Sequence, residues 1–221
     1  MLIFNLNPHF RAQMLVGRTL LCYFCSMKVF LRDDIQQIGP EQIGPLLSRL
    51  PQWRLEKALR FKHLSGQREC ATAYLLLADA LQTEYGITEV PPFAYTEHGK
   101  PYLPDYPHLH FNLSHCSHAV LCALDDQPIG ADVESIRAAR PGLLRYTMSE
   151  AEQALITSSP QPDRTFTTLW TRKEALLKLT GEGVGSEMHH ILLPQRLADA
   201  GIQIHTTICQ DYIYSVATRQ R

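Results

Sequence analysis

The segment I-G-A-D-V-E at residues 129–134 is the most informative stretch of this 221-residue chain. Successive side chains of a strand point to opposite faces, so Asp132 and Glu134 are expected to share one face. Val133 between them is expected to anchor the strand in the core. Gly130 has no side chain, so the chain can be approached closely at this point. The segment therefore predicts a strand with two carboxylates on one face beside a close packing point.

A second stretch, W-T-R-K-E-A-L-L-K at residues 170–178, has the spacing of a helix. Trp170, Glu174 and Lys178 follow one another at intervals of four and share one stripe of that helix. If this stripe packs on the strand at 129–134, three carboxylates and one lysine meet. Such an all-oxygen site suits a hard cation such as Mg²⁺, and the lysine adds positive charge for a phosphate. The combination predicts phosphoryl-group chemistry.

The composition is that of an ordinary soluble globular protein. The formal net charge is −1, with 45% hydrophobic and 19% charged residues, and the length is enough for one domain or two small lobes. The near-neutral net charge gives no support for nucleic-acid binding, which needs many positively charged side chains to neutralise phosphates. Six cysteines are too few for a disulfide scaffold, so we expect a reducing compartment, the cytoplasm.

The first 26 residues differ from the rest of the chain. Their apolar run at 14–25 is broken by Arg18, is too short to span a bilayer, and lacks the cleavage pattern of a secretory signal. We expect translation to start at Met27 and residues 1–26 to be an upstream extension without a defined fold. N-terminal sequencing of the native protein checks this expectation.

Beyond Met27, short apolar runs alternate with long helical patterns, and a polar loop with two Gly-Pro pairs is expected near residues 33–45. Each half of the chain offers several strands and one long helix. This pattern predicts an α+β fold of two similar lobes, a pseudo-dimer in which one helix covers each small, mostly antiparallel sheet. Lobes are expected at 27–108 and 109–221. The expected helices are 52–64, 67–85 and 164–180, and the expected strands are 110–112, 119–124, 129–134, ILLP at 191–194, IQIHTTI at 202–208 and YIYSVAT at 212–218.

Two further segments carry candidate binding residues. In F-N-L-S-H-C-S-H at 111–118, Ser114 and His115 follow an apolar strand end, a common place for ligand-binding groups. Neighbouring histidines also suggest zinc, but no partner cluster has the spacing of a zinc site. The second segment, 54–68, carries several cations that either rim an anion site or lie on a solvated helix face. The cations of this group are Arg54, Lys57 and Arg68, to which Lys100 in a turn at 97–101 is added.

These motifs, in this order and spacing, resemble the 4′-phosphopantetheinyl transferases, in the larger single-chain form typified by the surfactin-synthetase-activating enzyme. The matching stretches are 99–118, 129–134 and 169–183, with a weaker match at 54–68. The resemblance implies a two-lobed enzyme that transfers the phosphopantetheine arm of coenzyme A to a serine of an apo acyl or peptidyl carrier protein, leaving adenosine 3′,5′-bisphosphate. It leaves open which carrier is modified.

The resemblance also implies roles for individual residues. Asp132, Glu134 and Glu174 would hold Mg²⁺ on the pyrophosphate of coenzyme A. Lys178 would neutralise charge that develops there, and Glu174 or a metal-bound water would take the proton from the carrier serine. Seven residues would bind coenzyme A: Lys100, Ser114 and His115 at the 3′-phosphate, Arg54, Lys57 and Arg68 from the first lobe, and Lys173 near the phosphates.

Two other functions are alternatives to the transferase. A Mg²⁺-dependent hydrolase of nucleotide or pyrophosphate substrates would use the same acids with water as the nucleophile. A non-catalytic carrier-binding module would need neither the acids nor Lys178. The transferase is the preferred interpretation, acting as a monomer without nucleic-acid or membrane partners.

Overall fold

The computed structural model describes residues 11–15, 19–24, 27–181 and 186–220. The described residues form helices and three small antiparallel sheets, which confirms the α+β class. No helix in these ranges is long and apolar enough to cross a membrane.

The largest sheet has the strand order β1-β2-β3-β7-β6, the second has the order β8-β10-β9, and β4 pairs with β5. The strands of the first sheet are β1 (Arg11–Leu15), β2 (Thr19–Phe24), β3 (Met27–Arg32), β6 (His110–His115) and β7 (Val120–Asp125). The remaining strands are β4 (Ala94–Tyr95), β5 (Pro101–Tyr102), β8 (Ile129–Ser135), β9 (Ile202–Ile208) and β10 (Tyr212–Arg219).

Two long helices dominate the helical content, and short helices surround them. The helices are α1 (Pro40–Leu47), α2 (Gln52–Leu59), α3 (Leu64–Tyr85), α4 (Pro141–Thr147), α5 (Glu150–Ser158), α6 (Pro162–Thr180) and α7 (Pro194–Asp199). Two 3₁₀ turns, η1 (Ile35–Gln37) and η2 (Ser186–His189), complete the set. The long helices α3 and α6 end at Gly86 and Gly181, whose positive φ angles of 69° and 78° suit a glycine cap.

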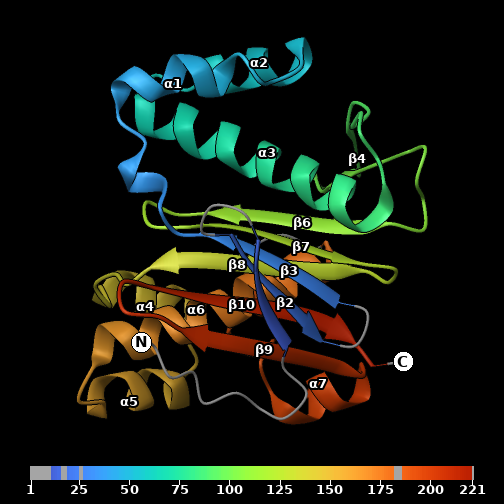
Figure 1. Ribbon diagram of the computed structural model, residues 1–221. Coiled ribbons are helices and arrows are strands. Elements are labelled where there is room, and N and C mark those ends of the chain that lie inside the picture. The colour runs from blue at the N-terminus through green and yellow to red at the C-terminus, as the bar shows by residue number, and fades with distance from the viewer. Residues whose placement is uncertain (1–10, 16–18, 25–26, 182–185, 221) are drawn as a thin grey trace.

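The elements stack in layers (Figure 1). Helices α1 and α2 lie on the outer side of α3, and α3 covers one face of the first sheet. The other face of that sheet packs on β8 and β10, and α6 covers the far side of the second sheet. The five-stranded sheet is therefore packed with α3 and the three-stranded sheet with α6, one long helix for each, as the sequence predicts.

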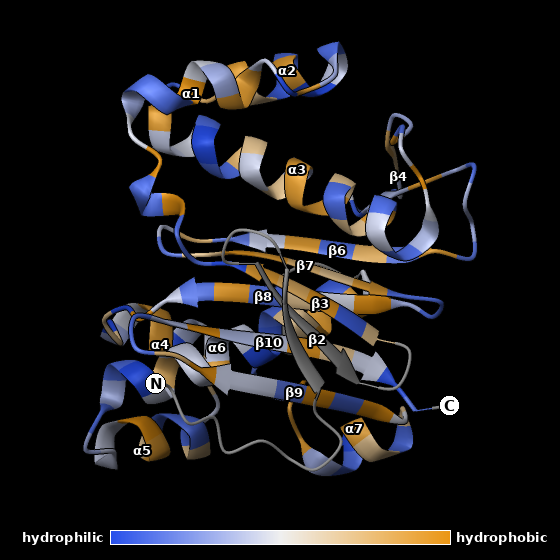
Figure 2. Cartoon of the chain, viewed as in Figure 1, coloured by the Kyte–Doolittle hydropathy of each residue, from blue (hydrophilic) through white to orange (hydrophobic). Residues whose placement is uncertain are grey.

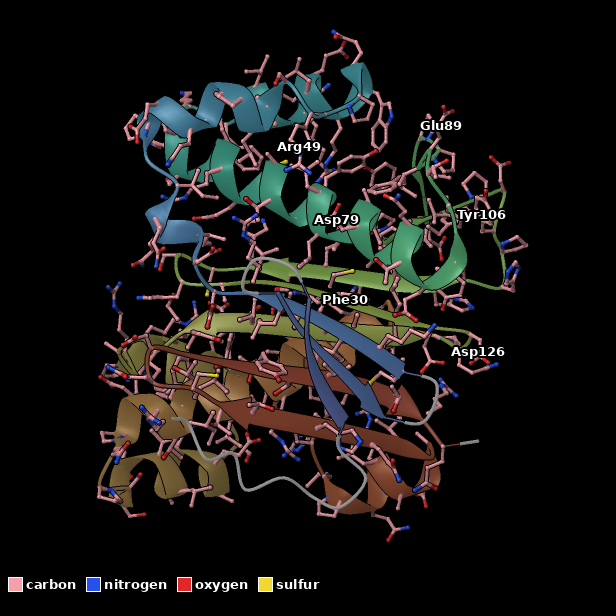
Figure 3. All side chains as sticks on the ribbon, in the orientation of Figure 1. Phe30, Arg49, Asp79, Glu89, Tyr106 and Asp126 are labelled. Atoms are coloured by element: carbon pink, nitrogen blue, oxygen red, sulfur yellow. The ribbon has the colours of Figure 1, made fainter. Side chains whose placement is uncertain are left out.

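Strand β7 lies at the centre of these layers and is buried on both faces. Its even-numbered residues, with Phe30 of β3, face α3, whereas Leu121 and Ala123 face the second sheet. Figure 2 shows the resulting apolar colour along β7, and Figure 3 labels Phe30 at the level of the first sheet, beneath α3. Burial on both sides explains why this strand is apolar at every position from 120 to 124 rather than alternating.

The two sheets meet at β6 and β8, which run in the same direction side by side. Between these two strands, hydrogen bonds from backbone amides to side chains take the place of a backbone hydrogen-bond ladder. Asn112 Oδ1 accepts a hydrogen bond from the Ala131 amide at 2.9 Å, and Ser114 Oγ accepts one from the Val133 amide at 3.2 Å. The two bonded amides flank Asp132, so this junction fixes the backbone that carries the first carboxylate of the site.

The first sheet combines strands from both of the expected lobes. Strands β6 and β7 pair with each other and β7 pairs with β3, so residues 110–125 belong to the sheet beneath α3. Pairing between β3 and β7 joins segments that are far apart in the chain, and a local sequence pattern does not specify such a partner.

Parts of the N-terminal segment 1–26 fall within the described residues. Residues 11–15 and 19–24 form the antiparallel strands β1 and β2, and β2 pairs with β3. Residues 1–10 lie outside the described residues. The run Thr19–Phe24 is rich in residues that favour strands, and the free edge of β3 gives it a partner.

Two smaller expectations are wrong. Residues 191–193, expected as a strand, form a turn and a short irregular link before α7, and Pro194 begins that helix at its first position. Residues 40–47, expected as a polar loop, form α1, which likewise begins with a proline at its first position. The other strands expected after residue 200 are confirmed as β9 and β10.

Candidate active site

The acidic strand and the helical stripe converge as their spacing predicts. Lys178 Nζ on α6 donates a hydrogen bond to Asp132 Oδ1 on β8 at 2.6 Å. Eight residues earlier along the stripe, about two helical turns, Trp170 Nε1 donates to Glu134 Oε1 at 3.0 Å. Asp132 and Glu134 face α6, whereas Ile129, which alternates with them, packs between the sheets.

Glu174 lies on the same stripe between these two contacts. Burial raises the pKa of Glu174 and of Glu134 above the ordinary glutamate value, and repulsion from the Asp132 carboxylate raises both further. The three carboxylates therefore share one electrostatic environment. Lys178 offsets part of the repulsion that acts on Glu174.

Gly130 allows the helix to approach the strand this closely. A Cβ atom placed on it would lie 2.0 Å from the Ala175 carbonyl oxygen and 2.3 Å from the Leu179 amide nitrogen of α6. Both distances are far below a van der Waals contact with backbone atoms that cannot move alone. The predicted close approach beside the acids is therefore a helix crossing.

Ser114 belongs to the same hydrogen-bond network. Its Oγ donates to Asp132 Oδ1 at 2.9 Å and accepts from Lys178 Nζ at 3.1 Å. Ser114, Asp132 and Lys178 are therefore mutually connected, and the serine is buried. The structure places Ser114 at the first carboxylate of the site.

Lys100 connects the turn at 97–101 to the end of α6. Its Nζ donates to the carbonyl oxygens of Ile129 at 2.9 Å and Lys178 at 2.6 Å, with a longer contact to Leu179 at 3.4 Å. Carbonyls at a helix C-terminus attract a cation, while burial lowers the pKa of Lys100 to about 8. In this arrangement the lysine joins β8 to α6 and lines the adjacent cavity.

That cavity has a volume of about 250 Å³. It lies between the turn that carries Lys100, strand β6 and the last turns of α6. Glu174 and Lys178 contribute to its wall from the helix, and Asn112 contributes from β6. The cavity therefore opens directly on two of the residues with expected catalytic roles.

His115 lies at the end of β6 and faces α3. Its Nδ1 atom is 3.2 Å from Glu69 Oε2, and its side chain is 37% exposed. An exposed imidazole at a strand end is accessible to a ligand, so the position is compatible with the expected phosphate contact.

The cations of the first lobe do not form one open rim. Arg54 is buried, and its guanidinium lies 5.6 Å from the ring centres of Tyr74 and Phe93. Lys57 Nζ donates to the Tyr95 hydroxyl at 3.3 Å, and Arg68 Nη1 donates to the Ile38 carbonyl at 3.3 Å. In the structure Arg54 therefore packs among aromatic rings.

Lys173 is fully buried on another side of α6. Its Nζ donates to Glu152 Oε2 at 2.7 Å and to the carbonyl oxygens of Thr147 and Met188. Adjacent residues of a helix point about 100° apart, so Lys173 cannot share the stripe of Glu174. In the structure Lys173 therefore joins α6 to the elements that carry Thr147, Glu152 and Met188.

Glu152 at the start of α5 has two partners. It forms a capping box with Ser149 at the start of α5 and also accepts the hydrogen bond from Lys173. Removing the partners of a buried lysine costs free energy of folding. The ion pair with Glu152 therefore keeps the Lys173 side chain on the buried side of α6, which fixes the rotation of this helix about its axis.

The residues fit a hard cation by their chemistry. All candidate ligands are carboxylate oxygens, and Asp132 Oδ2 is buried without a hydrogen-bond partner among the described residues. Within the same part of the chain, no group of three acidic, histidine or cysteine side chains is close enough to hold a metal ion in the present arrangement. Lys178 Nζ instead donates a hydrogen bond to the other carboxylate oxygen of Asp132, Oδ1.

Comparisons with known proteins agree on one family. The family model described as the 4′-phosphopantetheinyl transferase superfamily matches residues 128–217, which include β8, α6 and β10. The chain is similar to the 4′-phosphopantetheinyl transferase Sfp of Bacillus subtilis (strain 168), with 29% identity over 72% of each chain. It is 32% identical to psf-1 of Bacillus pumilus over 72% of this chain and 70% of that protein.

A further relative, the 4′-phosphopantetheinyl transferase HetI of Nostoc sp. (strain PCC 7120), is 32% identical over 65% of this chain and 64% of that protein. The matching region carries the convergent acids, the helix stripe and the glycine crossing described above. The chain therefore belongs to the 4′-phosphopantetheinyl transferase superfamily.

Proposed function

We propose that this enzyme transfers the 4′-phosphopantetheine arm of coenzyme A to a serine of an apo acyl or peptidyl carrier protein and releases adenosine 3′,5′-bisphosphate. The observation that carries this proposal is the contact between β8 and α6, which brings Asp132 and Lys178 within 2.6 Å of each other beside a cavity. Phosphoryl transfer depends chiefly on positioning and charge stabilisation, and this arrangement supplies both.

Asp132, Glu134 and Glu174 would hold Mg²⁺ on the pyrophosphate of coenzyme A. The unpartnered Asp132 Oδ2 and the mutual repulsion of the three carboxylates support this assignment, because a divalent cation would satisfy both. When bound, Mg²⁺ supplies Lewis-acid polarisation of the phosphates.

The chain's own residues account for the remaining requirements. Lys178 places an ammonium group beside the developing negative charge and lies on the wall of the cavity. Glu174 would accept the proton of the carrier serine, and its raised pKa brings it closer to the neutral range in which a general base works best.

Several broader features belong to the same proposal. The chain would act as a monomer in the cytoplasm, and its two lobes would form a pseudo-dimer with coenzyme A between them. One long helix on each sheet and the β6–β8 junction support the two-lobed arrangement. Lys57 and Arg68, together with Lys100, Ser114 and His115, would bind the nucleotide end of coenzyme A.

The decisive test is a carrier-modification assay. Incubation of the enzyme with coenzyme A, Mg²⁺ and several apo carrier proteins should increase the carrier mass by one phosphopantetheine arm. Release of phosphate without any carrier modification would indicate the hydrolase. Tight carrier binding without turnover would indicate a non-catalytic binding module.

Replacement of His115 by alanine should raise the Michaelis constant for coenzyme A by ~10-fold, because one hydrogen bond to a charged phosphate is lost. The assay is repeated with dephospho-coenzyme A, which lacks the 3′-phosphate. Wild type and variant should use that donor equally well. His63→Ala, at an exposed position, serves as a control that keeps wild-type kinetics. A variant that is equally impaired with both donors would contradict the 3′-phosphate contact.

Mg²⁺ at ten times its dissociation constant should raise the thermal unfolding midpoint of the metal-free protein by ~3–6 °C. Glu134→Gln should lose most of this response, since glutamine keeps an oxygen for Trp170 but no charge. Glu97→Gln removes an exposed carboxylate and should respond like wild type. Scanning fluorimetry measures both, and an undiminished response in Glu134→Gln would remove this residue from the metal site.

A further inference from the structure

Asn112 is a polar residue of the site that the sequence motifs did not single out. It lies in the middle of β6 and is 5% exposed. It also contributes to the wall of the 250 Å³ cavity, together with Glu174 and Lys178. A nearly buried carboxamide at a cavity wall raises the question of which groups satisfy its donors and its acceptor.

The hydrogen bond to Ala131 fixes the orientation of the Asn112 amide. The Ala131 N–H is a donor, so the atom that faces it at 2.9 Å is the oxygen, Oδ1. The Nδ2 group, with two N–H donors, therefore points away from β8. Among the hydrogen bonds of the described residues, none uses Asn112 Nδ2 as a donor.

Nδ2 is not one of the buried polar atoms that lack a partner, so this donor is accessible from the cavity rather than sealed in the core. The ammonium groups of Lys100 and Lys178, which line the same cavity, already donate to protein oxygens. Asn112 therefore offers the cavity a neutral donor that is not committed elsewhere. Its natural partner is an anionic oxygen.

We propose that Asn112 binds the donor substrate directly, with Nδ2 donating a hydrogen bond to a phosphate oxygen of coenzyme A in this cavity. The inference rests on the proposed function. The same side chain holds the Ala131 amide next to Asp132, so it ties the position of the substrate to the position of the first carboxylate.

Two substitutions separate the donor from the acceptor. Asn112→Ala removes both groups. Asn112→Asp keeps an oxygen for the Ala131 amide and replaces the Nδ2 donor by a second oxygen. Gln127→Glu adds the same negative charge at an exposed turn and controls for the charge introduced by aspartate.

Calorimetry should show that Asn112→Ala weakens coenzyme A binding by ~10-fold and Asn112→Asp by at least as much, the loss expected for a hydrogen bond to a charged group. Gln127→Glu should bind within twofold of wild type. The Michaelis constant for the carrier should not change in either Asn112 variant, which a merely structural role would not predict. Because aspartate preserves the contact with β8, that variant remains informative if alanine unfolds the protein.

Coenzyme A affinity within twofold of wild type in folded Asn112→Asp would overturn the proposal. An equal loss of coenzyme A and carrier affinity, with a lower unfolding midpoint, would also overturn it. Wild-type protein that binds coenzyme A but modifies no carrier would refute the transferase function and leave the Asn112 contact testable by binding alone. Wild-type protein that binds no coenzyme A would refute both.

Discussion

Replacement of Gly130 by alanine is expected to displace α6 from β8 and to lower turnover by ~10²-fold, the loss that accompanies a misplacement of about 1 Å at a reacting centre. The added methyl group would overlap the Ala175 carbonyl and the Leu179 amide, and neither backbone atom can move without the helix. Overpacking of this kind costs ~3 kcal/mol, which lowers the unfolding midpoint by ~6–12 °C in a chain of this length.

Gly44→Ala provides the matched control. Gly44 lies within α1, and a Cβ atom there meets nothing within 4 Å. Alanine should therefore leave activity unchanged and stabilise the protein by ~0.4–1 kcal/mol. Thermal melts and the carrier assay measure both variants. Wild-type activity in Gly130→Ala would show that the strand and helix can separate without loss of the site.

Replacement of Glu174 by glutamine is expected to lower turnover by ~10²-fold or more, because it removes either a general base or a charged metal ligand. Glutamine has nearly the same shape, and Glu174 lies at the cavity wall rather than in the core, so the fold should be preserved. Single-turnover mass spectrometry of a carrier protein measures the chemical step directly.

Glu150→Gln, at an exposed position on α5, is the corresponding control and should keep wild-type turnover. Coenzyme A binding helps to separate the two roles of Glu174. If Glu174 acts only as the general base, Glu174→Gln should lower turnover without changing the affinity for coenzyme A. If Glu174 is a metal ligand, the variant should change both the affinity for coenzyme A and the dependence of turnover on Mg²⁺. Turnover near wild type would mean that Glu174 has neither role.

The sequence predicted the centre of the site because its geometry is local. Side chains two residues apart on a strand point to the same face, which places Asp132 and Glu134 together on β8. Side chains four residues apart on a helix lie on the same stripe, which aligns Glu174 with Lys178 on α6. Only the meeting of strand and helix required a long-range assumption, and the contact between Lys178 and Asp132 confirms it.

The sequence does not specify contacts between elements that lie far apart in the chain. Whether Arg54 faces solvent or the rings of Tyr74 and Phe93 depends on how α2 packs on α3, and composition does not specify this packing. Lys173 has the appearance of a phosphate ligand in the sequence, but its neighbours Thr147 and Glu152 belong to other helices.

Asn112 was missed for a different reason. Its position in F-N-L-S-H places it on the same face of β6 as Ser114, two residues later. That alternation was the available signal. Ser114 and His115 are neighbours in the sequence, but adjacent strand residues point to opposite faces, so this pair does not indicate the face that carries Asn112.

The junction between β6 and β8 has a consequence for dynamics. Two side chains, rather than a continuous ladder, shield the amides of Ala131 and Val133, so local opening there does not require either sheet to unfold. Hydrogen–deuterium exchange at these two amides should therefore be faster than in β7, and a bound donor substrate should slow it. Exchange at the β6–β8 junction would then report whether donor substrate is bound, while the rest of the molecule stays protected from exchange.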